Sequence, residues 1–380
     1  MPESTPLPKL LLVAASSRYM LCHHAPFIAA AARQWTVHLA VALDSPADTR
    51  ELERRGCVVH SLAVSRSSAN PFRVHGEIRA LRALVRRIAP DVVDAFTIKC
   101  VFAAAMACSG MDVGFMATVV GLGYMFSGDS MKQRILRRLV MRALSRKLPR
   151  LRHAVLFSNS DDRETFRRYG LCLEDDPDIV PVPGIDENEF AFLPEDPSAF
   201  RVVLPSRMLR EKGVAEFVDA ARIVRQTHPH IQFLLAGDRD DNPSALTGEE
   251  LAGWSAEGFI AWMGRIEDMP ALLASCHVVC LPSYYREGFP RVLAEAMSCG
   301  RAIVTTDVPG CRDVGGVYRC GLVTPPRDAG ELARAVVRLH DSPELRRELG
   351  ARGREMALRH LREEDLTRRV LRILERFKTL

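Results

Sequence analysis

Residues 287–295, which read Glu-Gly-Phe-Pro-Arg-Val-Leu-Ala-Glu, are the part of the sequence that best indicates the fold. The apolar run 277–281 just upstream predicts a buried strand, and the segment 291–299 has helical spacing, with Pro290 suited to the first helical position and Gly300 to the stop. Residues 301–306 are predicted to form the next strand. A strand-helix-strand unit of this kind is typical of open parallel sheets, which bind ligands beyond the carboxyl ends of their strands.

Two carboxylates lie on either side of this loop-to-helix junction. Glu287 falls in the loop after the predicted strand, and Glu295 lies about two helical turns further along. Carboxylates accept hydrogen bonds from hydroxyl groups, so two of them at separated points suit a polyhydroxylated ligand.

Length and composition predict a globular protein of two domains. The chain has 380 residues, of which 47% are hydrophobic and 26% charged, and this is too long for one typical core. Its ten cysteines form no CxxC pair, which favours reduced thiols and predicts neither a disulfide framework nor a zinc site. The short apolar run 10–15 is predicted to be a strand and not a signal peptide. No segment approaches the ~20 apolar residues that cross a bilayer, so any membrane contact is expected to be peripheral.

Apolar runs alternate with helical stretches in two series. The first series comprises residues 10–14, 37–41, 91–96 and 155–159, and the second begins with residues 201–205 and 231–237. This alternation predicts two doubly wound α/β domains with parallel sheets. Residues 186–197 mix acids and prolines without a clear period, as a hinge does, and residues 343–380 are helical and basic.

Arg207 and Lys212 follow a predicted strand and precede a predicted helix, so they are expected to face the same crevice as Glu287. A guanidinium and an ammonium group can bind and neutralise an anionic group such as a phosphate, and helix N-termini add N–H donors. The alternative is a pair of solvated basic residues. The triplet Asp238-Arg239-Asp240 matches a short metal-binding pattern, but a loop or cap role is favoured.

The segment 287–310, with Glu287, Glu295 and the run Gly-Arg-Ala-Ile-Val-Thr-Thr-Asp-Val-Pro-Gly at residues 300–310, resembles the nucleotide-sugar site of family 4 retaining glycosyltransferases. The resemblance implies the α/β GT-B fold, in which two Rossmann-like doubly wound domains face a central cleft. It implies an acceptor-binding domain at 1–190, a nucleotide-sugar-binding domain at 191–358, and a C-terminal helix at 359–380 that packs back toward the first domain.

The resemblance also assigns site residues. The catalytic candidates are Glu287, Arg207 and Lys212, with Glu287 bound to hydroxyls of the transferred sugar and Glu295 to the ribose. Five residues are expected to form the nucleotide-sugar site: Gly288, Phe289, Pro290, Leu293 and Glu295. No metal and no cofactor is expected, because the nucleotide sugar is a co-substrate.

In the first domain, residues 118–127 read Thr-Val-Val-Gly-Leu-Gly-Tyr-Met-Phe-Ser and resemble bacterial family members that extend undecaprenyl-diphosphate-linked saccharides, as do residues 70–71, 97–99 and 157–162. The expected acceptor contacts are Lys99, Gly121, Gly123 and Tyr124. The chain departs from the family pattern at Ala15-Ser16-Ser17-Arg18, where relatives carry a Gly-rich loop, and at Asp94, where many relatives have His.

Residues 130–160 contain no Asp or Glu. Their basic residues are Lys132, Arg134, Arg137, Arg138, Arg142, Arg146, Lys147, Arg150 and Arg152. With interleaved apolar residues, this stretch predicts an amphipathic helix that binds an anionic membrane surface through residues 131–152, where each basic residue contributes ~1 kcal/mol. The alternative is a solvated basic helix. Nucleic-acid binding is not expected, because no recognisable nucleic-acid-binding module is present and the net charge is only +5.

The expected function is that of a retaining hexosyltransferase of cell-surface polysaccharide or glycan assembly. It moves a hexose or N-acetylhexosamine from a nucleoside diphosphate sugar, with UDP favoured, to a lipid-linked saccharide on the inner face of the cytoplasmic membrane. Two alternatives stay open, a nucleotide-sugar epimerase of the same fold and a non-catalytic donor-binding subunit of an assembly complex. The nucleotide base, the sugar, the linkage and the oligomeric state are not fixed by these patterns.

Overall fold

The computed structural model describes residues 6–62, 70–128, 130–172, 179–182, 184–197, 199–240 and 242–378, and for Tyr124 it describes the backbone alone. The chain divides into two compact units. Unit 1 comprises residues 1–183 and 363–380, and unit 2 comprises residues 184–362. Among the described residues, no helix combines the length and apolar character needed to cross a membrane.

Unit 1 contains a six-stranded parallel sheet with the order β3-β2-β1-β4-β5-β6. Its strands are β1 (Lys9–Val13), β2 (Thr36–Val41), β3 (Cys57–Ser61), β4 (Val92–Phe96), β5 (Gly114–Val119) and β6 (Arg152–Phe157). Its helices are α1 (Ser17–Ala31), α2 (Pro46–Arg54), α3 (Pro71–Ile88), α4 (Thr97–Cys108), α5 (Met131–Lys147), α6 (Ser160–Arg168) and α14 (Glu363–Glu375), with short 3-10 turns η1 (Gly123–Phe126) and η2 (Leu148–Arg150).

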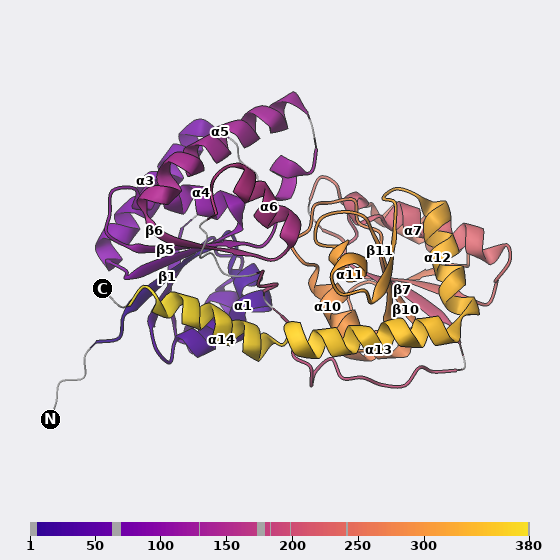
Figure 1. The fold of residues 1–380 in the computed structure, drawn as a ribbon. Helices are drawn as coiled ribbons and strands as arrows, with labels where there is room; N and C mark the ends of the chain where they lie inside the picture. Colours follow the sequence, from indigo (N-terminus) through magenta and orange to yellow (C-terminus); the bar gives the residue numbers. More distant parts are fainter. Residues whose placement is uncertain are drawn as a thin grey trace. The chain divides into compact units, whose positions relative to one another are not determined.

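Helices cover both faces of the unit 1 sheet (Figure 1). Alternate strand residues point to opposite faces, so Leu11 and Val93 pack against α3, α4 and α5, whereas Leu10 and Val92 pack against α1 and α14. Strands that are apolar on both faces are expected in such a sheet, because helices bury both sides.

Unit 2 repeats the same arrangement with the order β12-β11-β10-β7-β8-β9, again all parallel. Its strands are β7 (Arg201–Pro205), β8 (Gln232–Ala236), β9 (Ile260–Trp262), β10 (Val278–Leu281), β11 (Ala302–Thr306) and β12 (Gly321–Thr324). Its helices are α7 (Val214–Arg225), α8 (Gly248–Ala256), α9 (Met269–Ser275), α10 (Arg291–Ser298), α11 (Asp313–Gly316), α12 (Ala329–Asp341) and α13 (Pro343–His360), with the 3-10 turn η3 (Arg210–Lys212).

The two helices that matter most for the site lie on opposite faces of the unit 2 sheet. Phe217 of α7 packs in one core with residues of α8 and α12, whereas Leu293 of α10 packs in the other core with residues of α9 and α13. The order of the strands reverses between β7 and β10, which are hydrogen-bonded neighbours. The loops after these two strands therefore diverge, and this is where doubly wound sheets bind ligands.

The unit boundaries differ by a few residues from those expected from the sequence. The break falls after Pro183 instead of residue 190, because the segment from Gly184 onward packs into unit 2, where Ile185 and Phe190 are buried. The second break falls after Arg362, since the expected position at 358/359 lies within α13. Helix α14 then contributes Leu366 and Leu374 to the core of unit 1.

The predicted basic helix is shorter than expected. Helix α5 ends at Lys147, and Arg152 belongs to strand β6, so the range 131–152 is not one helix. Pro149 explains the early end, because it lacks the N–H that would donate to the carbonyl of Ser145 in a continuing helix. The guanidinium of Arg152 lies 5.9 Å from the ring centre of Phe377.

Asp94 is a buried carboxyl group in the centre of the unit 1 sheet. Its Oδ1 accepts a hydrogen bond of 2.7 Å from the hydroxyl of Thr118, whereas Oδ2 is buried and has no hydrogen-bond partner among the described residues. The group lines a small cavity of about 20 Å³ together with His24 and Glu363. Burial raises the pKa of Asp94 to about 8, although the Thr118 hydrogen bond opposes the shift.

Replacement of Asp94 by Asn is expected to reduce the pH dependence of stability. Because the pKa of Asp94 is raised, the native state keeps a proton that the unfolded chain has lost between about pH 4 and pH 8, so stability falls as pH rises through this range. Between pH 6 and pH 8 the wild type should lose roughly 2 kcal/mol more than Asp94→Asn in urea unfolding. Asp112→Asn, at an exposed position, is the control. Parallel pH profiles for the wild type and Asp94→Asn would contradict the expectation.

Candidate functional site

An ion pair joins the loops that follow β7 and β10. Lys212 ends the turn η3, Glu287 lies between β10 and α10, and they are 75 positions apart in the sequence. The Nζ atom of Lys212 lies 2.5 Å from Oε1 of Glu287, and the two side chains are 16% and 12% exposed. The structure thus brings two of the three predicted catalytic side chains into direct contact at the point where the strand order reverses.

Glycines allow these loops to approach closely. Gly213 has φ +75°, and a Cβ atom there would lie 2.1 Å from the carbonyl oxygen of Pro282. Gly310, in the loop after β11, has φ +80°, and its Cβ would lie 2.1 Å from the carbonyl oxygen of Gly288. Both neighbours are backbone atoms that cannot move independently of their loops, so only glycine fits at either position.

Ser283 is a site residue that the sequence patterns did not single out. It is fully buried just after β10, and its hydroxyl lies 3.0 Å from Oε1 of Glu287 and 3.2 Å from the carbonyl of Glu211. The hydroxyl of Thr306 donates to the Ser283 carbonyl. Ser283 therefore fixes the carboxylate of Glu287 from the side of the sheet. The sequence feature that could have indicated Ser283 as a site residue is its position two residues beyond a predicted strand.

The other cations of the β7 loop also face carboxylates. Arg207 donates to Oδ2 of Asp240 at 2.7 Å, and Arg210 donates to Glu250 at 2.7 Å. Asp240 is the second aspartate of the triplet at residues 238–240. One of the two carboxylates of this triplet therefore pairs with a predicted catalytic cation. The Arg207 side chain is 61% exposed, and an incoming anion can reach it.

Two helices begin at this site without a side-chain cap. Neither Gly213 before α7 nor Pro290 before α10 makes a side-chain hydrogen bond to the first turn. Side chains cap α8, α9 and α12 in the same unit, whereas α11 and α13 also begin without a side-chain cap. Helix N-termini that carry no side-chain cap present backbone N–H groups and a partial positive charge to an anion.

Glu295 lies in the second turn of α10 and is buried, where it accepts a hydrogen bond of 2.8 Å from Arg291. Burial raises the pKa of Glu295, and Arg291 partly opposes the shift. Pro290 is the N-cap residue of α10 instead of its first helical residue, and the ring of Phe289 packs edge-on against Tyr318.

The side chain of Leu293 lies in the core of unit 2. Its side chain is fully buried in the core between α10 and the sheet, and its N–H donates to the carbonyl of Pro290. It faces the sheet because apolar residues on an amphipathic helix turn toward the core. The side chain of Leu293 therefore packs in the core, and the expectation that this residue contacts the nucleotide sugar stays a prediction.

The expected acceptor residues of unit 1 lie at the carboxyl ends of two neighbouring strands. Lys99 is in the first turn of α4, directly after β4, whereas Gly121 (φ +128°) and Gly123 (φ +59°) follow β5. The Nζ atom of Lys99 lies 3.9 Å from Oε2 of Glu77, and partial burial lowers the pKa of Lys99. The side chain of Tyr124 lies outside the described residues.

A carboxylate occupies the N-terminus of α1, where relatives are expected to carry a Gly-rich loop. Asp44 Oδ2 accepts hydrogen bonds from the hydroxyls of Ser16 (2.5 Å) and Ser17 (3.1 Å) and from the N–H of Arg18 (2.9 Å). The first helix of unit 1 is thus already complemented by an anionic side chain of the protein.

Replacement of Gly310 by Ala is expected to destabilise unit 2 by roughly 2 kcal/mol or more, since the new Cβ would clash with the backbone of the Glu287 loop. Thermal unfolding measures the effect. Gly316→Ala is the matched control, because a Cβ there meets no atom within 4 Å. Equal melting temperatures for the two variants would show that the loops do not need this close approach.

Comparisons with known proteins identify relatives of both units. The family model described as "Glycosyl transferase 4-like" matches residues 9–150, and the model described as "Glycosyl transferases group 1" matches residues 199–342. A relative from Campylobacter jejuni, N,N'-diacetylbacillosaminyl-diphospho-undecaprenol alpha-1,3-N-acetylgalactosaminyltransferase, is 27% identical over 344 residues, which cover 86% of this chain and 88% of the relative. Alpha-D-kanosaminyltransferase of Streptomyces kanamyceticus is 34% identical over 150 residues, or 38% of this chain and 37% of that protein.

Solved structures share the fold over nearly the whole chain. Anabaena HepE in complex with UDP and glucose aligns with a TM-score of 0.74 at 18% identity, covering 97% of this chain and 99% of that one. Sucrose-phosphate synthase from Thermosynechococcus elongatus aligns with a TM-score of 0.75 at 18% identity, covering 97% and 98%. With two parallel six-stranded sheets of the same strand order, and family matches in both units, the chain belongs to the family 4, or group 1, glycosyltransferases of the GT-B fold.

Proposed function

We propose that this glycosyltransferase transfers a hexosyl or N-acetylhexosaminyl group from a nucleoside diphosphate sugar, with UDP as the favoured carrier, to a lipid-linked saccharide with retention of configuration. The observation that carries the proposal is the Lys212–Glu287 pair between the diverging loops of β7 and β10. The Campylobacter relative is named for transfer to an undecaprenol-linked saccharide, and Anabaena HepE binds UDP; both support the proposed substrate classes.

Arg207 and Lys212 are proposed to hold the diphosphate of the donor. Each pairs with a carboxylate in the structure, and each has further N–H donors, so a diphosphate can bind while the contact with the carboxylate is kept. The N-termini of α7 and α10 add N–H groups from two sides. Together these groups supply positive charge to the leaving group, and transfer is expected to proceed without a metal ion.

Glu287 and Glu295 are proposed to recognise hydroxyl groups of the transferred sugar and of the ribose. The carboxylate of Glu287 is held by Ser283 and Lys212, which leaves its orientation little freedom. Preorganised acceptors of this kind discriminate strongly against sugars that lack the matching hydroxyl group. Gly288 and Phe289 follow Glu287 in the same loop, and their backbone groups are proposed to line the sugar site.

The chemical step is proposed to be a front-face displacement, as the resemblance to retaining family members implies. The acceptor hydroxyl attacks the anomeric carbon on the face from which the diphosphate leaves, and its proton passes to a phosphate oxygen of the departing group. The two cations stabilise the negative charge that grows on the diphosphate as the glycosidic bond to it breaks. In unit 1, Lys99, Gly121 and Gly123 are proposed to contact the diphosphate-linked acceptor.

Replacement of Lys212 by Ala is expected to lower kcat by roughly 10²–10³, because one source of transition-state charge stabilisation is lost. Glu295→Ala should instead weaken donor affinity in calorimetry and leave the melting temperature nearly unchanged. Arg334→Ala, which removes an exposed ion pair of unit 2, is the control for both. A Lys212→Ala enzyme with wild-type turnover would refute the assignment.

Product analysis separates the proposal from its alternatives. Nucleotide release is measured for a panel of donors with and without a prenyl-diphosphate saccharide, in the presence of EDTA. Release that requires the lipid acceptor supports transfer. Formation of an epimeric sugar without acceptor, or binding without turnover, would favour the epimerase or the non-catalytic subunit.

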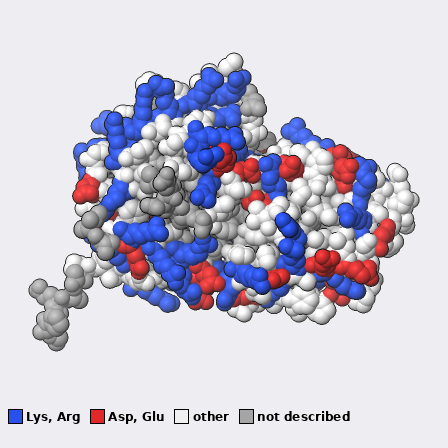
Figure 2. All heavy atoms as spheres, in the orientation of Figure 1, with Lys and Arg blue, Asp and Glu red and all other residues white. Residues whose placement is uncertain are grey.

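Helix α5 is proposed to dock unit 1 on an anionic membrane surface. Three apolar side chains on one row of the helix point to solvent, and these are Met131 (69% exposed), Ile135 (50%) and Leu139 (62%). An adjacent exposed row contains Arg134, Arg138, Arg142 and Arg146. Figure 2 shows Lys and Arg side chains gathered along the edge of unit 1 where α5 lies. An exposed apolar row beside a basic row suits the interface of an anionic bilayer better than water.

The double variant Arg138→Ala/Arg142→Ala is expected to weaken binding to vesicles with anionic lipid by roughly 2 kcal/mol, about thirtyfold, in co-sedimentation at low salt. Ile135→Ser/Leu139→Ser should weaken binding by loss of apolar burial. Arg334→Ala/Arg359→Ala removes two exposed arginines of unit 2 and is the matched control. Binding that depends on neither anionic lipid nor salt would end the membrane hypothesis.

A further inference from the structure

A cluster of three histidines and one aspartate lies at the amino-terminal edge of the unit 2 sheet. His228 and His230 precede β8, and His340 and Asp341 are the last two residues of α12. The Lys212–Glu287 pair follows the carboxyl ends of the strands, so this cluster lies at the opposite edge of the same sheet. It takes no part in the proposed transfer reaction.

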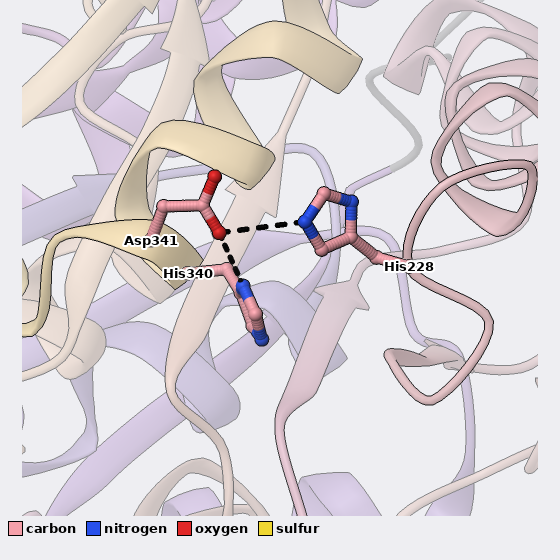
Figure 3. A group of neighbouring side chains, drawn as sticks. All are labelled: His228, His340 and Asp341. Atoms are coloured by element: carbon pink, nitrogen blue, oxygen red, sulfur yellow. Dashed lines mark hydrogen bonds and ion pairs between the residues drawn. The ribbon is translucent and has the colours of Figure 1, made fainter.

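Three potential ligand atoms converge in the cluster. Oδ1 of Asp341 lies 2.7 Å from Nδ1 of His340 and 3.4 Å from Nε2 of His228 (Figure 3), and the three atoms all lie within 4.8 Å of one another. A tetrahedral metal ion with bonds of ~2.0–2.2 Å holds its ligand atoms roughly 3.3–3.6 Å apart. Small side-chain rotations therefore suffice to place an ion between them.

The ring nitrogens that face away from this point have partners of their own. Nδ1 of His228 lies 2.8 Å from the hydroxyl of Thr227, and Nε2 of His340 lies 2.9 Å from Nε2 of His230. Metal-ligating histidines in general donate their second N–H to such an outer group, which fixes the tautomer and the orientation of the ring. Thr227 and His230 are in position to do this for both imidazoles.

The surroundings are also suitable for an ion from solution. The side chains of His228 and His340 are 21% and 22% exposed, whereas Asp341 is 53% exposed. The ring of Phe200 packs edge-on against His340 with 4.9 Å between ring centres, which limits the movement of that ring. The imidazoles are thus held by their neighbours while the shared point stays open to solvent.

We propose that His228 Nε2, His340 Nδ1 and Asp341 Oδ1 bind a divalent transition-metal ion, with zinc as the best match. Two imidazole nitrogens and one carboxylate oxygen favour zinc-like ions over Mg²⁺ and Ca²⁺, which prefer oxygen ligands alone. Water fills the remaining position. The ion links the segment after α7 to the end of α12, two helices that pack on the same face of the sheet, and so stabilises unit 2.

The test uses the untagged chain with Cys22→Ser, because Cys22 is the exposed thiol among the ten cysteines. After chelator treatment, Zn²⁺ is titrated by calorimetry, Co²⁺ by visible absorption, and melting temperature is recorded with and without Zn²⁺. The proposal predicts saturation at one ion per chain, a cobalt spectrum of nitrogen and oxygen ligands, and a melting temperature that rises with Zn²⁺ and falls back with EDTA.

Single variants distinguish ligands from orienting partners. His228→Ala and Asp341→Asn should abolish the Zn²⁺-induced rise in melting temperature, and His230→Ala should weaken affinity about tenfold. His75→Ala and His360→Ala, both at exposed positions, should behave as the parent. Affinity that survives both His228→Ala and Asp341→Asn, the absence of saturable binding, or thiolate absorption in the Co²⁺ complex would overturn the proposal. The cobalt spectrum is measured on the parent chain, so it tests the nature of the ligands even if a variant fails to fold.

Discussion

In unit 2, the helices after two neighbouring strands leave toward opposite faces of the sheet, and the loops that lead to them are then drawn together by glycine contacts. The strand order reverses between β7 and β10, so α7 and α10 diverge. Gly213 permits this approach between the loops after β7 and β10, and Gly310 permits it between the loops after β10 and β11, at distances that no side chain would tolerate. The contact between Lys212 and Glu287 depends on this close approach of the loops. The two residues are far apart in the sequence, and only the packing of their loops brings them together.

The electrostatics of the site follow from the same geometry. Lys212 and Glu287 are largely shielded from water, so their attraction is stronger than that of a surface pair, and removal of either partner leaves a poorly solvated charge. Arg207 and Arg210 have their own carboxylate partners. Carboxylates of the protein therefore balance the charge of the cations in these loops and keep them ordered.

The two units have the same strand order but differ in what lies at their first helix. In unit 1, Asp44 supplies the negative charge at the N-terminus of α1 through Ser16 and Ser17. In unit 2, α7 begins without a side-chain cap. A helix N-terminus favours one anion, and a protein carboxylate in that position competes with a phosphate. At the first helix of unit 1 the protein itself thus supplies the anion, whereas the N-cap residue of α7 supplies none.

The amino-acid sequence by itself determined the alternation of strands and helices, the presence of two doubly wound domains, and the candidates Arg207, Lys212, Glu287 and Glu295. These features depend on local patterns, namely apolar periodicity and residues at strand ends, which neighbours in the chain specify. The tertiary structure alone decided that Lys212 bonds to Glu287, that Ser283 holds the same carboxylate, and that the side chain of Leu293 lies in the core. It also decided that His228 and His340, which are 112 positions apart in the sequence, both contact the carboxylate of Asp341. Such contacts arise from the packing of distant segments across a sheet, and no local pattern encodes which side chains will meet there.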